Sequence, residues 1–214
     1  ASTVTLYESS TSLGTTASHA STGAWSITSS ALTGSNAGTG HSINIVSIDK
    51  AGNIATSTAL SITIDTGVDT PGAPDLLAAS DSNVNKDNVT SDTTPNFTGS
   101  VEIGSSITLK SGSSSVGTDT ADGTSGAYSV TASALSAAGS TGTGHFMTVV
   151  ATDKAGNVST ASTALEVQID NTAPAAPTSL ELISSSDSGT NTDNITNHQH
   201  HTNKAKSTKD SHPS

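Results

Sequence analysis

The acidic side chains of this sequence are its most evident candidates for a binding site. The chain of 214 residues carries 18 acidic and 7 basic residues, for a net charge of −11 with neutral histidines. Many of the acids stand beside Asn, Ser or Gly in short polar runs such as DKAGN, which occurs at residues 49–53 and again at 153–157. Carboxylate and amide oxygens are ligands for hard cations, and calcium binds about six to eight of them. Cation binding therefore depends on which acids the fold brings together.

The sequence repeats itself after about 105 residues. GAWSITSSAL at residues 23–32 is similar to GAYSVTASAL at 126–135, and DSNVNKDN at 81–88 has a second copy, DSGTNTDN, at 187–194. A unit of this length is too long for one turn of a solenoid and is the size of a small β-sandwich domain. We expect a truncated unit with only the later strands at residues 1–66, a complete unit at 67–171, and the start of a third unit at 172–214.

Alternating apolar and polar residues predict seven strands in the complete unit, and no helical period is present. The predicted strands are residues 75–80, 95–102, 105–112, 114–120, 126–135, 145–152 and 162–170. Tyr128 and its counterpart Trp25 are expected to fill the cores of their units. In DKAGN, Gly156 or Asn157 is expected to adopt the positive φ of a tight hairpin. The fold class is therefore all-β, with tandem immunoglobulin-like β-sandwich domains.

Composition excludes several classes of function. The chain has no cysteine and no arginine, so it lacks thiolate metal ligands and the basic face that a nucleic-acid-binding protein needs. No apolar run approaches the roughly 18 residues of a membrane span, and no nucleophile–base pair, phosphate-binding glycine loop or HExxH helix is present. We expect no enzyme activity, no nucleic-acid partner and no membrane insertion. No leader opens the sequence, so we expect an export signal outside this segment.

The predicted strand order brings acids together where the complete unit meets the unit before it. Glu102 follows the second strand and Asp153 follows the sixth, and both loops lie at the same pole because antiparallel strands reverse at each loop. Asp65 ends the preceding unit, and Asp69 lies in the linker. Carboxylates this close repel one another unless a cation binds them, so we predict a junction calcium ion held by these four residues. The alternative is that Asp153 caps its own hairpin while Glu102 is a solvated loop residue.

The run DSNVNKDN is a second, weaker candidate cation site, at the opposite pole. Its candidate ligands are Asp81, Asp87, Asn88 and Asp170. The equivalent loop of the third unit offers Asp187, Asp193 and Asn194. The alternative is an Asx-turn loop, in which these side chains cap their own backbone.

The repeat pattern ends after Asn197. The sequence HQHHTNKAKSTKDSHPS follows at residues 198–214, in place of a copy of DTTPNFTG. It lacks the apolar alternation of a strand, so we predict a disordered tail from residue 198. A change of reading frame is an alternative origin for this tail.

The motifs FTG, VEIG, DKAGN and ID followed by TAP occur in an order that resembles the bacterial Ig-like repeats of giant RTX and biofilm-associated surface adhesins. The resemblance covers residues 1–196. It implies export by a type I route, an extracellular or cell-surface location, calcium between neighbouring domains, and a role as an extender or stalk. The partners would be neighbouring repeats of the same chain and, through other parts of the parent protein, a host or abiotic surface. A ligand-binding adhesion module and a spacer domain of a secreted hydrolase remain as alternatives.

Overall fold

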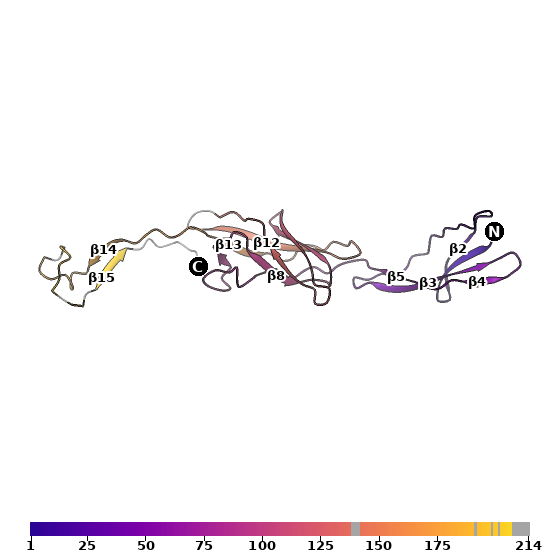
Figure 1. The fold of residues 1–214 in the computed structure, drawn as a ribbon, viewed down its shortest axis with the longest axis horizontal. Coiled ribbons are helices and arrows are strands. Elements are labelled where there is room, and N and C mark those ends of the chain that lie inside the picture. Colours follow the sequence, from indigo (N-terminus) through magenta and orange to yellow (C-terminus); the bar gives the residue numbers. More distant parts are fainter. Residues whose placement is uncertain (138–141, 191, 198, 201, 207–214) are drawn as a thin grey trace.

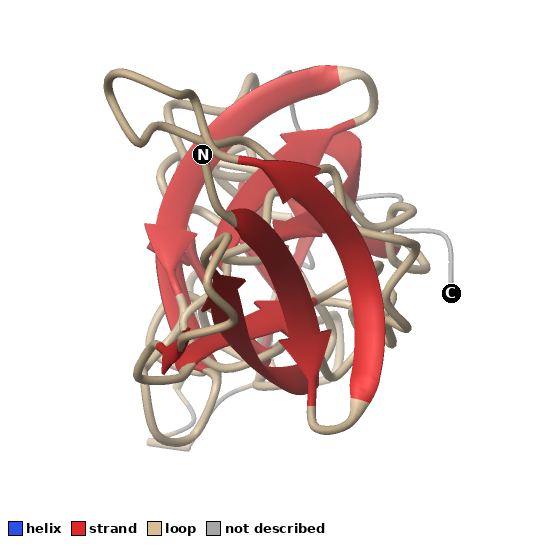
Figure 2. Cartoon of the chain, turned by 90° about the vertical axis from the view of Figure 1, so that its right-hand side faces the viewer, coloured by secondary structure: helices blue, strands red, loops and turns tan. Residues whose placement is uncertain are grey.

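All regular structure in the described residues is β-strand. The structure is a computed structural model that describes residues 1–137, 142–190, 192–197, 199–200 and 202–206. Its strands form three groups that follow one another along the long axis of the molecule (Figure 1), and only strands and loops are drawn in the end-on view of Figure 2. Within the described residues, no helix is long and apolar enough to cross a bilayer. The predicted all-β class is confirmed.

The first unit is a single five-stranded sheet. Its strands are β1 (Thr3–Glu8), β2 (Thr11–Ala17), β3 (Thr39–Ile48), β4 (Ile54–Thr56) and β5 (Leu60–Ile64). Strands β2, β1, β3 and β4 lie side by side in that order, and β5 pairs with the first half of β3. Strand β3 is therefore the central strand of the sheet, because it pairs with β1, β4 and β5.

The second unit is a sandwich of two sheets. Its strands are β6 (Asp75–Leu76), β7 (Val89–Thr90), β8 (Asn96–Ser100), β9 (Ser106–Ser111), β10 (Ser114–Thr120), β11 (Ala127–Thr131), β12 (Thr143–Thr152) and β13 (Leu165–Ile169). The larger sheet has the order β10-β9-β12-β13-β7, and the smaller has the order β11-β8-β6. All seven predicted strands are present: five are shorter than predicted, β10 has the predicted bounds, and β12 begins two residues earlier than predicted.

Strand β7 is the element that the sequence did not predict. It has only two residues, too few for an alternating pattern, and it pairs with β13 in parallel. Its place is set by Thr90, which is 1% exposed and donates its hydroxyl hydrogen to the carbonyl oxygen of Ser80. The pairing that defines this strand therefore joins segments far apart in the sequence.

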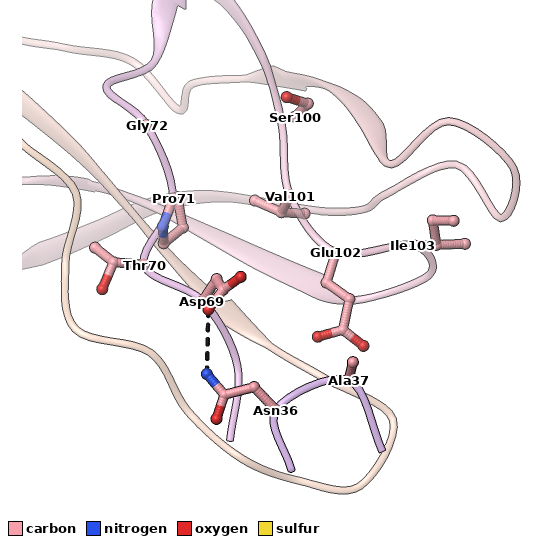
Figure 3. A pocket seen from close by; sticks show the side chains of 10 residues that line it. All are labelled: Asn36, Ala37, Asp69, Thr70, Pro71, Gly72, Ser100, Val101, Glu102 and Ile103. Carbon is pink, nitrogen blue, oxygen red and sulfur yellow. Dashed lines mark hydrogen bonds between the residues drawn. The ribbon is translucent and has the colours of Figure 1, made fainter. Parts of the chain in front are cut away.

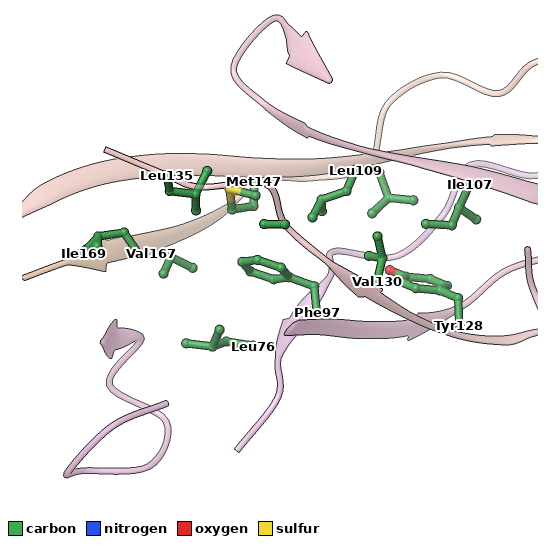
Figure 4. Packing of buried hydrophobic residues seen from close by; sticks show 12 residues of the cluster. Leu76, Phe97, Ile107, Leu109, Tyr128, Val130, Leu135, Met147, Val167 and Ile169 are labelled. Atoms are coloured by element: carbon green, nitrogen blue, oxygen red, sulfur yellow. The ribbon is translucent and has the colours of Figure 1, made fainter. Parts of the chain in front are cut away.

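The core of the second unit lies between its two sheets (Figure 4). Phe97, Tyr128 and Val130 project from the smaller sheet toward Leu109 and Met147 of the larger one (Figure 4). Four of these five side chains are at most 2% exposed, and Tyr128 is 5% exposed. Each fully buried apolar side chain of this size contributes about 1.5–3 kcal/mol, so this core can hold the loops at both poles in place.

Trp25 does not fill the core of the first unit, contrary to the prediction. Its side chain is 44% exposed, whereas that of its counterpart Tyr128 is 5% exposed. Tyr128 lies in β11, which is held by pairing with β8. Within residues 1–66, all of which the structure describes, no strand corresponds to β8, and the run 23–32 forms no strand. The indole therefore has no second sheet to pack against.

The third unit is a two-stranded ribbon of β14 (Thr178–Leu182) and β15 (Asn203–Lys206). Strand β15 lies within the tail for which the sequence predicts disorder, so the structure differs from that expectation at residues 203–206. Strands pair through backbone groups, so an exposed ribbon of this kind does not require the apolar alternation that the tail lacks. Lys204 Nζ also lies 3.6 Å from Glu181 Oε2. Residues 207–214 lie outside the described residues.

Candidate functional site

The DKAGN segment of the second unit is a turn that is closed by its own side chains. Asp153 Oδ1 accepts the backbone N–H of Asn157 at 2.9 Å, and Asp153 Oδ2 accepts its side-chain amide at 2.7 Å. Gly156 has a φ of 94°, which confirms the predicted positive φ. Burial acts to raise the pKa of Asp153, but the hydrogen bonds from Asn157 outweigh it, and the pKa is lowered. The capping role considered for Asp153 is therefore present.

The first unit closes its DKAGN segment in the same way. Asp49 Oδ1 accepts the backbone N–H groups of Ala51 at 2.8 Å and Asn53 at 2.9 Å, and Asp49 Oδ2 accepts the Asn53 amide at 2.8 Å. Local turn chemistry thus accounts for the occurrence of this motif in both units.

Asn157 also connects the second unit to the first. Its Nδ2 lies 3.3 Å from the carbonyl oxygen of Asp65 and 3.4 Å from Asp65 Oδ1, in addition to its bond to Asp153. Asp65 is held to the first unit by an isolated bridge to Ser35. One amide therefore joins two of the predicted acids across the junction. The motif alone does not reveal this role: among the described residues, Asn53, the same residue of the motif in the first unit, bonds within its own loop.

The linker is held by further polar contacts on both sides. Asp69 Oδ1 accepts a hydrogen bond from Asn36 Nδ2 at 3.1 Å (Figure 3). The next residue, Thr70, lies 2.6 Å from Thr160, hydroxyl to hydroxyl. The linker thus contacts a loop of the first unit and a loop of the second.

Glu102 lies in the turn after β8, which faces the linker. It lines a pocket of about 570 Å³ together with Asp69 and Asn36, and its carboxylate points toward the loop of the first unit (Figure 3). The packed junction desolvates this exposed residue, and desolvation is the largest cause of its raised pKa; the charges of Asp65, Asp153 and Asp69 follow, in that order. The structure therefore brings the four predicted acids within electrostatic reach of one another.

These acids do not form a finished coordination shell. Within the described part of the chain, no three acidic, histidine or cysteine side chains are arranged to hold one metal ion. The oxygens of Asp153 and Asp69 accept hydrogen bonds from Asn157 and Asn36. A carboxylate oxygen has further lone pairs, so these bonds leave coordination capacity. The junction calcium site remains a prediction.

The second predicted cation site is divided between two pockets. Asp87 and Asp170 line one pocket of about 380 Å³, whereas Asp81 and Asn88 line another of about 380 Å³ together with Asp75. Asp87 Oδ1 accepts the backbone N–H two residues later at 3.0 Å, and Asp170 Oδ1 does the same at 2.9 Å. For these two residues the Asx-turn alternative applies. The four residues therefore do not share one pocket.

The loop of the third unit shows the same division. Asp187 and Asn194 line one pocket, of about 160 Å³. Asp193 Oδ1 instead accepts the backbone N–H of Ile195 at 3.0 Å.

Residues 68–171 match the model of the bacterial Ig-like domain. This unit is a bacterial Ig-like domain. The two-sheet sandwich and the capped DKAGN turn are therefore features of a member of that family. A search of curated proteins finds no match for the chain.

Two solved structures are similar in fold to the chain that carries this bacterial Ig-like domain. The first comprises the fibronectin(III)-like modules of CbhA from Clostridium thermocellum, with a TM-score of 0.39 and 14% identity over 78% of this chain and 77% of that one. The second is a Ca2+-stabilized adhesin that helps an Antarctic bacterium reach out and bind ice, with a TM-score of 0.37 and 23% identity. The alignment to the adhesin covers 86% of this chain and 43% of the adhesin chain.

Proposed function

We propose that this chain is an extender segment, or stalk, of a secreted or cell-surface bacterial adhesin, and that calcium at the junction between units makes it rigid. The observation that carries the proposal is the gathering of Asp65, Asp69, Glu102 and Asp153, from two units, around one short linker. The proposed partners are neighbouring Ig-like units of the same chain and, through other parts of the parent protein, a surface. The role requires no catalysis.

Electrostatics explains why a cation would matter at this junction. The raised pKa of Glu102 means that its charged form is disfavoured, first by desolvation and then by the charges of the other acids. A calcium ion would replace this repulsion with attraction to carboxylates of both units. At a concentration about ten times its dissociation constant, one bound ion stabilises the bound form by roughly 1.4 kcal/mol. The junction would then have one preferred geometry in place of several.

The linker itself limits the motion that calcium would have to suppress. Pro71 and Pro74 fix two φ angles within it, and both residues are buried. The amide of Asn157 and the hydroxyl pair of Thr70 and Thr160 add contacts across the junction. These contacts and the two prolines support a junction of limited motion.

The test measures the distance between the two units. Because the chain has no cysteine, spin labels can be placed on introduced cysteines at the exposed positions Ser42 in β3 and Ser129 in β11. The distance distribution is recorded by electron paramagnetic resonance with chelator and with about 10 mM calcium, roughly ten times the weaker limit for extracellular sites. We expect calcium to narrow the distribution.

Paired variants separate a junction site from a general charge effect. Glu102→Gln/Asp69→Asn removes two junction charges and should abolish the effect of calcium. Glu166→Gln/Asp92→Asn removes two charges outside the junction, and calcium should still narrow the distance distribution of this variant. A distribution that calcium does not change, or an equal loss of response in both double variants, would refute the junction site.

A further inference from the structure

His41 lies buried between two hydrogen-bond acceptors in the first unit. The residue belongs to β3 and is 5% exposed. Its Nδ1 lies 2.7 Å from Glu8 Oε1, and its Nε2 lies 2.8 Å from the carbonyl oxygen of Thr33. A carboxylate and a carbonyl can only accept hydrogen bonds, whereas a neutral imidazole has a single N–H to donate. Both contacts are therefore hydrogen bonds only when the ring carries two protons.

The counterpart of this histidine in the second unit, His145, needs one proton for the same two contacts. Its Nε2 lies 2.9 Å from the carbonyl oxygen of Ser136, but its Nδ1 lies 3.0 Å from the hydroxyl of Ser111, which stands at the position of Glu8. A hydroxyl can donate to an unprotonated Nδ1, so a neutral ring satisfies both bonds here. The carboxylate of the first unit is therefore what makes the arrangement depend on protonation.

The carbonyl of Thr33 belongs to the crossover segment, residues 18–38, which leads from β2 to β3. In the second unit the equivalent segment contains β11, which pairs with β8. The crossover segment, which the structure describes in full, forms no such strand; the Ser30 N–H bonds it to the Leu13 carbonyl at 2.8 Å. The bond from the histidine therefore contributes to a connection that strand pairing reinforces in the second unit but not in the first.

The residues that follow Thr33 lie against the strand end that carries Asp65. A Cβ on Gly34 would come within 2.5 Å of Thr66 Cγ2, so the two segments are in close contact there. The carbonyl oxygen of Ser35 accepts the backbone N–H of Thr66 at 3.2 Å, and Ser35 forms an isolated bridge with Asp65. The position of Thr33 is therefore coupled through two residues to an acid at the junction.

We propose that the ring of His41, protonated and bonded to both Glu8 and Thr33, is a pH-dependent switch that holds the crossover segment against the end of β5 and thereby favours docking of the two units. When the ring loses a proton, one nitrogen presents a lone pair to an acceptor at hydrogen-bonding distance, so one of the two contacts becomes repulsive. The segment is then held less firmly, and with it Asn36, which bonds to Asp69 in the linker. The switch operates without calcium and does not rest on the function proposed above.

The charges around the ring set the direction of the response. The five strands of the first unit contain three titratable residues, Tyr7, Glu8 and His41. Tyr7 lies on the other face of the sheet, because successive strand residues alternate, and β5 presents an apolar residue beside the ring. In the crossover segment, His19 bonds within its own turn. The bond to the Thr33 carbonyl and then Glu8 raise the pKa of His41 above 6.5, so the switch is closed below about that pH and opens as pH rises through the folded-state pKa.

The experiment measures amide hydrogen exchange by NMR in the whole chain, in chelator, between about pH 5.5 and about pH 8.5, which brackets the ordinary pKa of histidine. The readouts are the amides of Ser30, bonded to Leu13, and of Thr66, bonded to Ser35, with each rate compared with its intrinsic rate at the same pH. We expect both protection factors to fall about fivefold as pH rises, the factor for one lost hydrogen bond. In Glu8→Gln the introduced amide can donate to an unprotonated Nδ1, so protection should stay constant.

Two comparisons decide whether the buried pair causes this response. His19→Gln removes the other histidine of the crossover segment and should leave the fall in protection unchanged. The amides of β1, a strand that is paired on both sides, should keep their protection, because the opening is local to the segment. Constant protection in the unmodified chain, or an equal fall in Glu8→Gln, would overturn the switch. A fall by the same factor at every amide of the first unit would indicate general unfolding and would overturn it as well.

Spin labels at Ser42 and Ser129 test whether the switch acts on the junction. Ser42 is exposed, on the face of β3 opposite to that of His41. In chelator, the distance distribution should broaden as pH rises through the same range, and Glu8→Gln should reduce this broadening. The junction acids titrate alike in the two chains, so the difference between them reports the switch. Equal broadening in both would refute the coupling to the junction.

Discussion

Replacing Asn157 by alanine tests whether the junction has stiffness of its own in the absence of calcium. The substitution removes two kinds of contact: the bond within the DKAGN turn to Asp153, and the bridge to Asp65 across the junction. Asn53→Ala removes the same turn bond in the first unit, to Asp49. The difference between the two variants therefore isolates the bridge.

The size of the effect follows from the geometry of the bridge. The donor–acceptor distances of 3.3 and 3.4 Å are long, so we take the low end of the net value of a hydrogen bond, about 0.5 kcal/mol. That energy corresponds to about a twofold change in the equilibrium between docked and undocked units. Spin labels at Ser42 and Ser129, measured in chelator, should show the docked population falling about twofold relative to the undocked one in Asn157→Ala.

The control variant is Asn53→Ala, which loses a turn bond but no contact across the junction. Asn53→Ala should lower the thermal stability of the first unit but leave the distance distribution unchanged. If the two variants broaden the distribution equally, or if neither does, the amide of Asn157 does not hold the units together, and stiffness must come from the linker or from an ion.

Three further predictions concern charge and packing. Because the folded-state pKa of Glu102 is raised above 4.5, the calcium-free chain should lose stability as pH rises from about that value through the folded-state pKa, and Glu102→Gln should remove this loss in thermal melts recorded across the window. The pKa of His41 is raised above 6.5, first by its hydrogen bond to the Thr33 carbonyl and then by Glu8; its contribution should be full below about 6.5 and disappear as pH rises through the folded-state pKa, with an NMR titration midpoint above 6.5 as the check. Phe97→Ala should lower the free energy of unfolding of the second unit by about 3–5 kcal/mol in denaturant titrations, because the Phe97 side chain is fully buried. Phe146→Ala, at the exposed phenylalanine of β12, should have a small effect on the same free energy.

Local patterns in the sequence were sufficient for the framework of the second unit. Alternation predicted the strands at residues 105–112 and 162–170, and the apolar positions of that alternation, Ile107, Leu109, Val167 and Ile169, are buried. The DKAGN turn followed from the glycine that needs a positive φ and from the aspartate that caps it. Antiparallel order then put Glu102 at the pole of Asp153. The strand faces, the DKAGN turn and the position of Glu102 depend on residues that are neighbours in the chain or on the direction of successive strands. A single sequence contains both kinds of information.

The tertiary structure decided the features that depend on contacts between distant segments. Strand β7 exists because Thr90 bonds to Ser80, and Trp25 is exposed because its unit has no strand equivalent to β8. The bridge from Asn157 to Asp65 could not be inferred either, since Asn53 occupies the same motif without such a contact.

The second candidate site shows the same distinction most clearly. Proximity in the run DSNVNKDN grouped Asp81 with Asp87, but the loop turns them into different pockets. Asp75, which precedes that run, joins Asp81 because β6 carries it there. The amino-acid sequence is enough to identify the residue types available to a cation and the strands that present them. Only the folded chain decided which of them meet, because burial and hydrogen-bond partners are set by segments far apart in the sequence.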